Sequence, residues 1–269
     1  MIATNPGRAL VLGPGGPVGT AWLLGLAAGL HRHGVDLAAA DLIVGTSAGA
    51  IAGAMIASGR DLDAWADTPS PARPPAAGGG AGPVMARVFG LLNDAALDPA
   101  EARRRVGRLA LEADALDGEA HRERIRALVG TDDWPDGQLL VTGVDVASGE
   151  PVVWDRTSGV PLSAAVAASS AAPGMARPVT IGGRRYMDGA FGGGSNAALA
   201  AGAGTVVLVE PVGFGGPGAG ADVRLVPDAG SLRAFGGDLG DTGRWGGCFR
   251  AGVRQSAGEA ARLRPGPWG

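Results

Sequence analysis

Short apolar runs and stretches of helical periodicity alternate at the start of the chain. Ala9 to Gly13 and Leu42 to Gly45 are apolar runs of strand length that end in glycine, which is typical of buried strands. Thr20 to His33 and Ala48 to Ser58 follow them with the spacing of helices. Because strand, turn and helix repeat in this order, the pattern predicts parallel strands covered by helices.

The later pattern adds helices and hairpins to this sheet. Pro99 to Val129 has the charge spacing of one or two helices, and Leu162 to Ala172 has the length of a short one. Alternating runs predict two hairpins, one formed by Leu139 to Val146 with Pro151 to Trp154 and one within Val179 to Met187 around Gly182-Gly183. A further apolar run, Val206 to Glu210, predicts a buried strand. We therefore expect an α/β fold of three layers, with a mainly parallel central sheet and helices on both faces.

Residues 69–83 differ from the rest of the chain because proline, alanine and glycine dominate them. This composition predicts a flexible insertion in a single domain that spans residues 1–269 and has its core at about residues 8–212. An apolar cluster lies just beyond the insertion: Met85, Val88, Phe89, Leu91 and Leu92. We expect these residues to pack on the core, with a lid or a membrane-touching element as the alternative.

Composition and charge narrow the class of protein. A hydrophobic fraction of 46% over 269 residues is enough for a sizeable core. The net charge of −3, with arginines interleaved with glutamates in the predicted helices, argues against a nucleic-acid partner. Cys248 is the only cysteine, which excludes an internal disulfide and a cysteine zinc site. With no signal-peptide pattern and no apolar run near the ~20 residues of a membrane span, we expect a cytoplasmic protein with at most peripheral membrane contact.

The sharpest chemical signal is the run Gly45-Thr46-Ser47-Ala48-Gly49, between a predicted strand and a predicted helix. A serine in G-x-S-x-G at this junction is typical of a nucleophile elbow. Glycines flank the serine because side chains would collide in so sharp a turn, and the helix N-terminus then faces developing negative charge. An ordinary helix start, capped by Thr46 or Ser47, is the alternative.

A nucleophilic serine needs a base, and the histidines are badly placed for that role. His31 and His33 close a predicted helix, where a positive side chain suits the helix dipole. His121 lies in a charged helix, and we expect it to have a surface role. Catalytic triads of α/β-hydrolases occur in the chain order serine, acid, histidine. All three histidines precede Asp188, so a triad in this order cannot use that aspartate as its acid.

The glycine-rich run from Gly13 to Gly19 lies between a predicted strand and a predicted helix, where backbone amides can face one site. Nucleotide binding is the alternative for such a loop. Its spacing does not match G-x-G-x-x-G, Pro14 and Pro17 remove two amides, and the chain has no lysine for a P-loop. The pattern therefore favours an oxyanion hole.

Together these segments resemble the patatin-like phospholipases of bacterial type. Segments spread over about residues 8–212 are similar to the motifs of that family. They are the glycine-rich loop at Leu10 to Gly19, the G-x-S-x-G at Gly45 to Gly49, the stretch Ala168 to Val179, and the D-G-[GA] motif in Tyr186-Met187-Asp188-Gly189-Ala190. The downstream Ser195-Asn196 and the strand Val206 to Pro211 are also similar to that family.

The resemblance implies a catalytic dyad, with Ser47 as nucleophile and Asp188 as general base. It also implies oxyanion donors in the glycine-rich loop and structural glycines in the other motifs: Gly15, Gly16, Val18 and Gly19 in the loop, and Gly45, Gly49 and Gly189 in the motifs. The chain departs from the family at Pro14, where a glycine is usual, and at Val18, where an arginine or lysine is usual.

The activity that the resemblance implies is hydrolysis of fatty acyl esters of phospholipids or other lipids through an acyl-serine intermediate. It requires no metal and no cofactor. Two alternatives use the same scaffold: an acyltransferase, and a non-enzymatic relative that binds acyl ligands.

Overall fold

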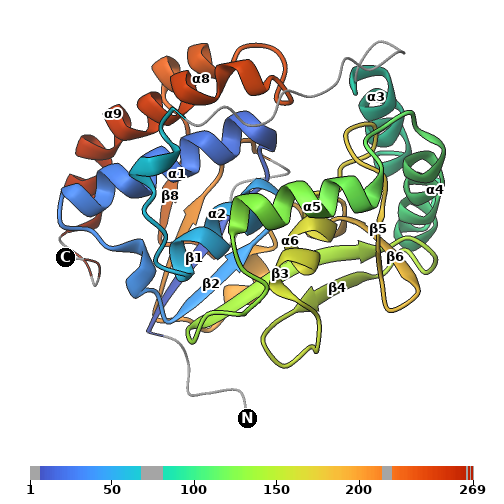
Figure 1. Ribbon diagram of the computed structural model, residues 1–269, viewed down its shortest axis with the longest axis horizontal. Helices are drawn as coiled ribbons and strands as arrows, with labels where there is room; N and C mark the ends of the chain where they lie inside the picture. The colour runs from blue at the N-terminus through green and yellow to red at the C-terminus, as the bar shows by residue number, and fades with distance from the viewer. Residues whose placement is uncertain (1–6, 68–80, 214–219, 265, 267, 269) are drawn as a thin grey trace.

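The computed structural model describes residues 7–67, 81–213, 220–264, 266 and 268. Within these residues, eight strands form one sheet in the order β5-β6-β3-β2-β1-β7-β8, and β4 also pairs with β3 (Figure 1). The strands are β1 (Arg8–Leu12), β2 (Leu42–Gly45), β3 (Gln138–Asp145), β4 (Pro151–Trp154), β5 (Val179–Ile181), β6 (Arg184–Asp188), β7 (Thr205–Val209) and β8 (Val223–Leu225). The helices are α1 (Gly16–Arg32), α2 (Ala48–Ala57), α3 (Gly82–Leu92), α4 (Pro99–Glu112), α5 (Gly118–Val129), α6 (Leu162–Ser169), α7 (Ala190–Gly193), α8 (Ala229–Phe235) and α9 (Trp245–Leu263).

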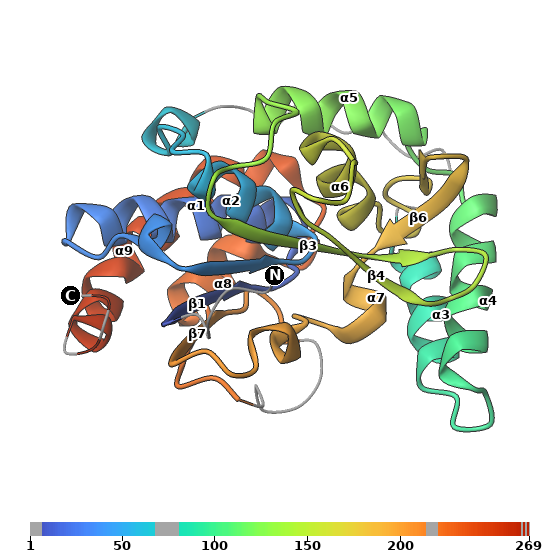
Figure 2. The same cartoon turned by 90° about the horizontal axis from the view of Figure 1, so that it is seen from below.

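The sheet is mostly parallel. Strands β8, β7, β1, β2 and β3 are joined by parallel pairs, and β3 with β4, β3 with β6 and β5 with β6 are antiparallel. The pairs β3–β4 and β5–β6 are the two predicted hairpins, which need only short connections. The predicted α/β class, a mainly parallel sheet with helices around it, is confirmed (Figures 1 and 2).

Both faces of the central strands are buried, but different structures cover them. Leu10 and Leu12 of β1 belong to the largest core cluster, which also contains residues of α1, α2, α5, α6 and α9. Ala9 and Val11 point to the other face, where a smaller cluster includes Ala200 of a short 3-10 helix, Ala197–Ala200. Figure 2 shows α1, α2, α5 and α6 together on one side of the sheet. Burial on both faces explains why β1 is a continuous apolar run.

Two boundaries and one core limit differ from the sequence-based predictions. The helix predicted at Thr20 to His33 starts earlier than expected, because α1 begins at Gly16 and Pro17 fits its first turn. Pro83 likewise lies in the first turn of α3, so the predicted loop at residues 69–83 extends too far, and residues 69–80 of it lie outside the described residues. The core also continues past residue 212, because Phe235 and Phe249 belong to the largest cluster.

Helices α1 and α9 pack with their backbones in close contact. A Cβ atom on Gly25 of α1 would overlap the carbonyl of Phe249, and one on Gly252 of α9 would lie 2.6 Å from the backbone nitrogen of Leu26. Only glycine allows such an approach. Because the glycine-rich loop leads into α1, this packing fixes the helix that the loop enters.

This contact predicts opposite effects for two glycine substitutions within α9. Gly252→Ala should destabilise the protein by about 1–3 kcal/mol, because the added methyl group has no space. Gly258→Ala should stabilise it by about 0.5–1 kcal/mol, since no atom lies within 4 Å of the added Cβ and alanine favours a helix. Thermal midpoints measured by circular dichroism compare the two variants. Equal midpoints would contradict the close backbone contact.

Candidate active site

The turn between β2 and α2 places Ser47 in an unusual backbone conformation. Its φ is 56° and its ψ is −117°, and only Ser47 and Asn196 have a positive φ among the described non-glycine residues. A non-glycine residue in this region costs about 1–3 kcal/mol and is found where the surroundings enforce it. The geometry is that of a sharp strand-to-helix turn with the serine at its apex.

The two glycines that flank Ser47 are required by space. A Cβ atom on Gly45 would lie 2.7 Å from the Cα atom of Ala50. One on Gly49 would lie 2.7 Å from the Cβ atom of Leu12 and would overlap its carbonyl oxygen. The strand β1 therefore lies directly against the start of α2, and the turn closes only with glycine at both positions.

Ser47 and Asp188, which are far apart in sequence, meet at this turn. The Ser47 hydroxyl donates a hydrogen bond to Oδ2 of Asp188 at 2.6 Å, and the two residues are only 6% and 2% exposed. Oδ1 of Asp188 accepts a 2.9 Å bond from the backbone N–H of Ala190. Ser169 links the backbones of the two segments. Its hydroxyl accepts the Ser47 N–H at 3.0 Å, and its carbonyl accepts the Gly189 N–H at 3.2 Å.

Burial changes the chemistry of the carboxyl group. It raises the pKa of Asp188 from 3.8 to about 7, although the hydrogen bonds from Ser47 and Ala190 act in the opposite direction. A carboxylate with a pKa near 7 accepts a proton far more readily than an exposed one. The side chain of Asp188 therefore has the proton affinity of a general base and direct contact with the Ser47 hydroxyl.

The four predicted oxyanion donors divide into two pairs. Val18 donates its N–H to the carbonyl of Leu239, in the loop after α8, at 3.4 Å, and Gly19 donates to Gly15 at 3.0 Å in the first turn of α1. Neither Gly15 nor Gly16 donates its N–H to another residue in the described part of the chain, and both line the same cavity as Ser47. Of the four predicted donors, Gly15 and Gly16 are therefore the two whose N–H groups make no such bond within the described residues.

Two further features explain the conformation of the motif glycines. Gly16 has a φ of +61°, and a Cβ there would lie 2.7 Å from the carbonyl oxygen of Leu239. A Cβ on Gly189 would lie 2.6 Å from the carbonyl oxygen of Thr142 on β3. Substitution at either position would displace the loop that carries it.

A polar cluster beneath the site was not predicted from the sequence. Nδ2 of Asn196 donates to Oγ1 of Thr46 at 3.0 Å and to Oγ1 of Thr142 at 3.2 Å, and the two hydroxyls are 2.9 Å apart. The same nitrogen lies 3.4 Å from the carbonyl oxygen of Gly189. Asn196 thus connects the residue before Ser47 to the residue after Asp188. Its positive φ of 57° is a conformation in which asparagine is enriched, but the sequence alone does not reveal the contacts.

Ser47 and Asp188 border a cavity of about 800 Å³. Its walls are mainly apolar and come from α2, α3, α5, α7 and the start of α9. The larger side chains among them are Ile51, Met85, Phe89, Leu128, Phe191 and Trp245. An apolar cavity with a few polar groups at one place is the usual form of a site for a hydrophobic ligand.

The predicted surface role of His121 is wrong. His121 is partly buried, lines this cavity, and places Nε2 3.1 Å from the hydroxyl of Ser170 on the adjoining segment after α6. Burial, with a smaller contribution from the charge of Arg124, lowers the pKa of His121 to about 4, so the imidazole is neutral at pH 7. The charged residues around His121 in the sequence indicated a solvent-exposed helix, but one face of α5 packs on α6.

Metal-binding clusters and membrane-spanning helices are both absent from the described residues. No group of three or more histidine, cysteine, aspartate or glutamate side chains in them has the arrangement of a metal site. Within the same residues, no helix combines the length and the hydropathy that crossing a membrane requires.

Comparison with known proteins decides the family. The family model described as Patatin-like phospholipase matches residues 10–201. The chain belongs to the patatin-like phospholipase family. The matched segment of this patatin-like chain contains the whole Ser47 turn, the glycine-rich loop and Asp188. The family is one of lipid hydrolases, which agrees with the resemblance seen in the motifs.

Solved structures resemble the chain more distantly. VipD from Legionella pneumophila is 15% identical, with 77% of this chain and 50% of VipD covered and a TM-score of 0.42. The type III effector protein ExoU is 17% identical, with 97% of this chain and 53% of ExoU covered and a TM-score of 0.43. The chain therefore spans about half the length of each. No curated protein matches the chain.

The raised pKa of Asp188 predicts that removing its charge stabilises the protein at high pH. Because the carboxyl is more easily protonated when folded than when unfolded, stability falls as pH rises from about 4 to about 7. Asp188→Asn should therefore have a higher thermal midpoint than the wild-type protein at pH 8, and the gain should shrink towards pH 4. A gain of the same size at both pH values would show that the buried charge is not its cause.

Proposed function

We propose that this chain is a serine acyl-ester hydrolase that cleaves fatty acyl esters of phospholipids or other lipids with a Ser47–Asp188 dyad. The observation that carries the proposal is the 2.6 Å hydrogen bond from the Ser47 hydroxyl to Asp188 at the edge of an apolar cavity. A nucleophile in contact with its base is the signature of covalent catalysis. Membership of a lipid hydrolase family supports the substrate class.

The first chemical step is attack by the Ser47 oxygen on the ester carbonyl. Asp188 accepts the hydroxyl proton as the bond between Ser47 and the acyl carbon forms, and the carbonyl electrons move onto its oxygen. When the tetrahedral intermediate collapses, the bond to the alcohol breaks and Asp188 returns the proton to the leaving alcohol oxygen. Acyl-Ser47 remains.

Deacylation repeats these events with water. Asp188 takes a proton from water, the hydroxide attacks the acyl carbon, and Ser47 leaves with that proton to release the fatty acid. In both halves negative charge develops on the carbonyl oxygen. The N–H groups of Gly15 and Gly16 stabilise it, aided by the positive end of α2.

The apolar walls of the cavity support a fatty acyl chain as the part of the substrate that is buried. Met85 and Phe89 of α3 and Phe191 of α7 line the same space as Ser47. A chain bound among them loses contact with water, which is favourable in proportion to the apolar area buried.

A direct test is covalent labelling with a fluorophosphonate, followed by intact-mass measurement and peptide mapping. We expect a single adduct on Ser47, and no adduct on the Ser47→Ala protein. An adduct on another serine would refute Ser47 as the nucleophile, and the absence of any adduct would leave an acyl-binding protein without enzymatic activity. Addition of an alcohol acceptor to the hydrolysis assay distinguishes an acyltransferase by its transfer product.

The dyad predicts matched losses of activity. Ser47→Ala and Asp188→Asn should each lower the turnover of a soluble ester by ~10³-fold or more, and the double variant should be little worse, because both residues act in one step. His33→Gln, at an exposed position beyond α1, is the control and should retain wild-type turnover. Near-normal turnover in a folded Asp188→Asn protein would exclude the proposed base.

The pH dependence of kcat/KM distinguishes Asp188 from His121. Because Asp188 must be ionised to accept a proton and its pKa is about 7, the rate should rise through neutral pH and level off above about pH 8. His121→Gln should keep this rising limb at the same pH, since His121 bonds to Ser170 and its pKa is about 4. A limb that moved or disappeared in His121→Gln would assign the titration to the histidine.

A further inference from the structure

The mouth of the active-site cavity can be located from two apolar side chains. Phe89 of α3 and Leu239, in the loop after α8, both line the cavity and are 41% and 36% exposed. Side chains that are part of a cavity wall and also face solvent lie at its opening. The opening is therefore bordered by large apolar groups, which isolated surface positions seldom place around one hollow.

The outer surface of α3 continues this apolar border. Its exposed positions include Pro83, Ala86 and Gly90, and Arg87 is the only charged residue between Gly82 and Leu92. A helix that faces water normally has a charged outer face, as the neighbouring α4 has. The inner side of α3 packs on the core, because Val88 is fully buried and belongs to a core cluster with Val106 of α4.

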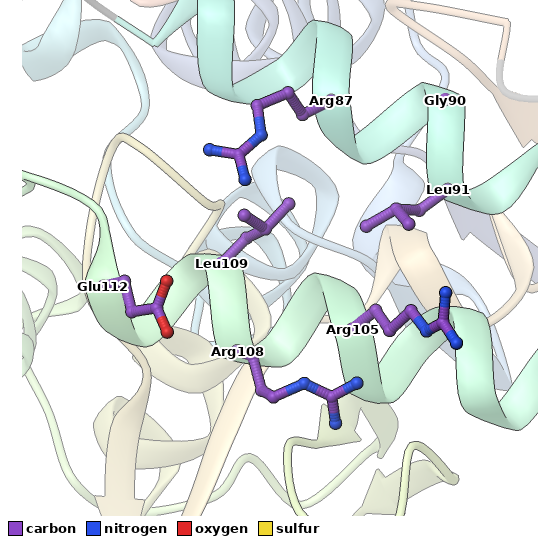
Figure 3. Close-up of a pocket in the computed structure, with 7 residues that line it drawn as sticks. All are labelled: Arg87, Gly90, Leu91, Arg105, Arg108, Leu109 and Glu112. Atoms are coloured by element: carbon purple, nitrogen blue, oxygen red, sulfur yellow. The ribbon is translucent and has the colours of Figure 1, made fainter.

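Arginines lie directly beside this helix. Figure 3 shows Arg87 on α3 with Arg105, Arg108 and Glu112 on α4 around one groove, and Leu91 and Leu109 between them. The two helices carry five arginines and two glutamates: Arg87, Arg103, Arg104, Arg105 and Arg108, with Glu101 and Glu112. This local positive excess contrasts with the net charge of −3 of the whole chain.

Neighbouring acids moderate the excess without cancelling it. Glu101 accepts bonds from Arg104, Arg105 and Arg108. Asp94 and Asp98 accept backbone N–H groups in and after the loop that joins α3 to α4, at one end of the helix pair. The groove between Arg87 and Arg108 is therefore the basic part of this surface.

We propose that the cavity mouth and the α3–α4 surface dock onto a bilayer that contains anionic phospholipids. The apolar border at Phe89 and Leu239 meets the acyl region, and the arginines of the groove meet phosphate groups. This proposal rests on the proposed function, because a lipid ester then moves from the bilayer into the cavity beside Ser47. A bilayer fits better than a protein partner because the apolar surface surrounds the entrance to the substrate site.

The experiment measures co-sedimentation with vesicles, using Ser47→Ala protein so that no lipid is consumed. Vesicles of phosphatidylcholine with phosphatidylglycerol should bind at least tenfold more protein than vesicles of phosphatidylcholine alone, and added salt should weaken the binding. Arg87→Glu in the same background should lower the partition coefficient on the order of tenfold, and Ala86→Glu should also lower it, since both positions lie on the exposed surface of α3.

The matched control is Arg264→Glu, which makes the same change of charge at an exposed position after α9. Figures 1 and 2 show the C-terminus and α3 on opposite sides of the molecule, so Arg264→Glu should bind within about twofold of the parent protein. Equal losses in Arg87→Glu and Arg264→Glu, or equal binding to both kinds of vesicle, would overturn the proposed surface.

A soluble ester separates failure of this surface from failure of the proposed function. With Ser47 intact, Arg87→Glu should hydrolyse a soluble ester at the wild-type rate. Wild-type turnover without any vesicle binding would overturn the docking surface, and the proposed hydrolase function would stand. Vesicle binding that is lost in Arg87→Glu, in a protein that never hydrolyses an ester, would support the surface and refute the hydrolase.

Discussion

The close approach of β1 to the start of α2 is the constraint on which the site depends. It leaves no room for a side chain at Gly49, while the backbone of Ala50 leaves none at Gly45, and the turn holds Ser47 at a positive φ that serine does not favour. The packed sheet and helices provide the stabilisation that keeps this turn closed. In return, the turn brings the Ser47 hydroxyl to the edge of the cavity and aligns the N-terminus of α2 with it.

Besides the strained backbone of Ser47, the buried carboxylate of Asp188 makes an unfavourable contribution to the folding free energy. Burying a carboxylate without a cationic partner is unfavourable, and its bonds from Ser47 and Ala190 offset only part of that cost, so its pKa stays near 7. A salt bridge with an arginine would stabilise the charge and would weaken the base. The same desolvation therefore lowers stability above neutral pH and supplies the proton affinity that hydrolysis needs, which couples the two properties in one side chain.

The parts of the fold and site that could be predicted are those that depend on short, continuous stretches of sequence. The apolar runs of β1 and β2 and the glycines around Ser47 each impose their own local structure, and the D-G-[GA] motif marks Asp188. The positions that were mispredicted depend on contacts between distant segments. His121 is in a charged helix, yet α6 covers one face of that helix, and the helix predicted from Thr20 begins at Gly16, inside the glycine-rich run. Composition also carried no signal for the close approach of α9 to α1, which depends on glycines where the two backbones meet.

Asn196 shows how distant segments are made to act together. The Ser47 turn follows β2 and Asp188 ends β6, and these strands are not neighbours, because β3 lies between them. Thr142 on β3, Thr46 before Ser47 and the carbonyl of Gly189 all lie within reach of the Asn196 amide. A shift of either loop would break these bonds in a buried place, where an unpaired polar group is costly. The 2.6 Å contact between Ser47 and Asp188 is therefore held from beneath as well as by the backbone turn, and the separation of the two groups does not depend on their own hydrogen bond alone.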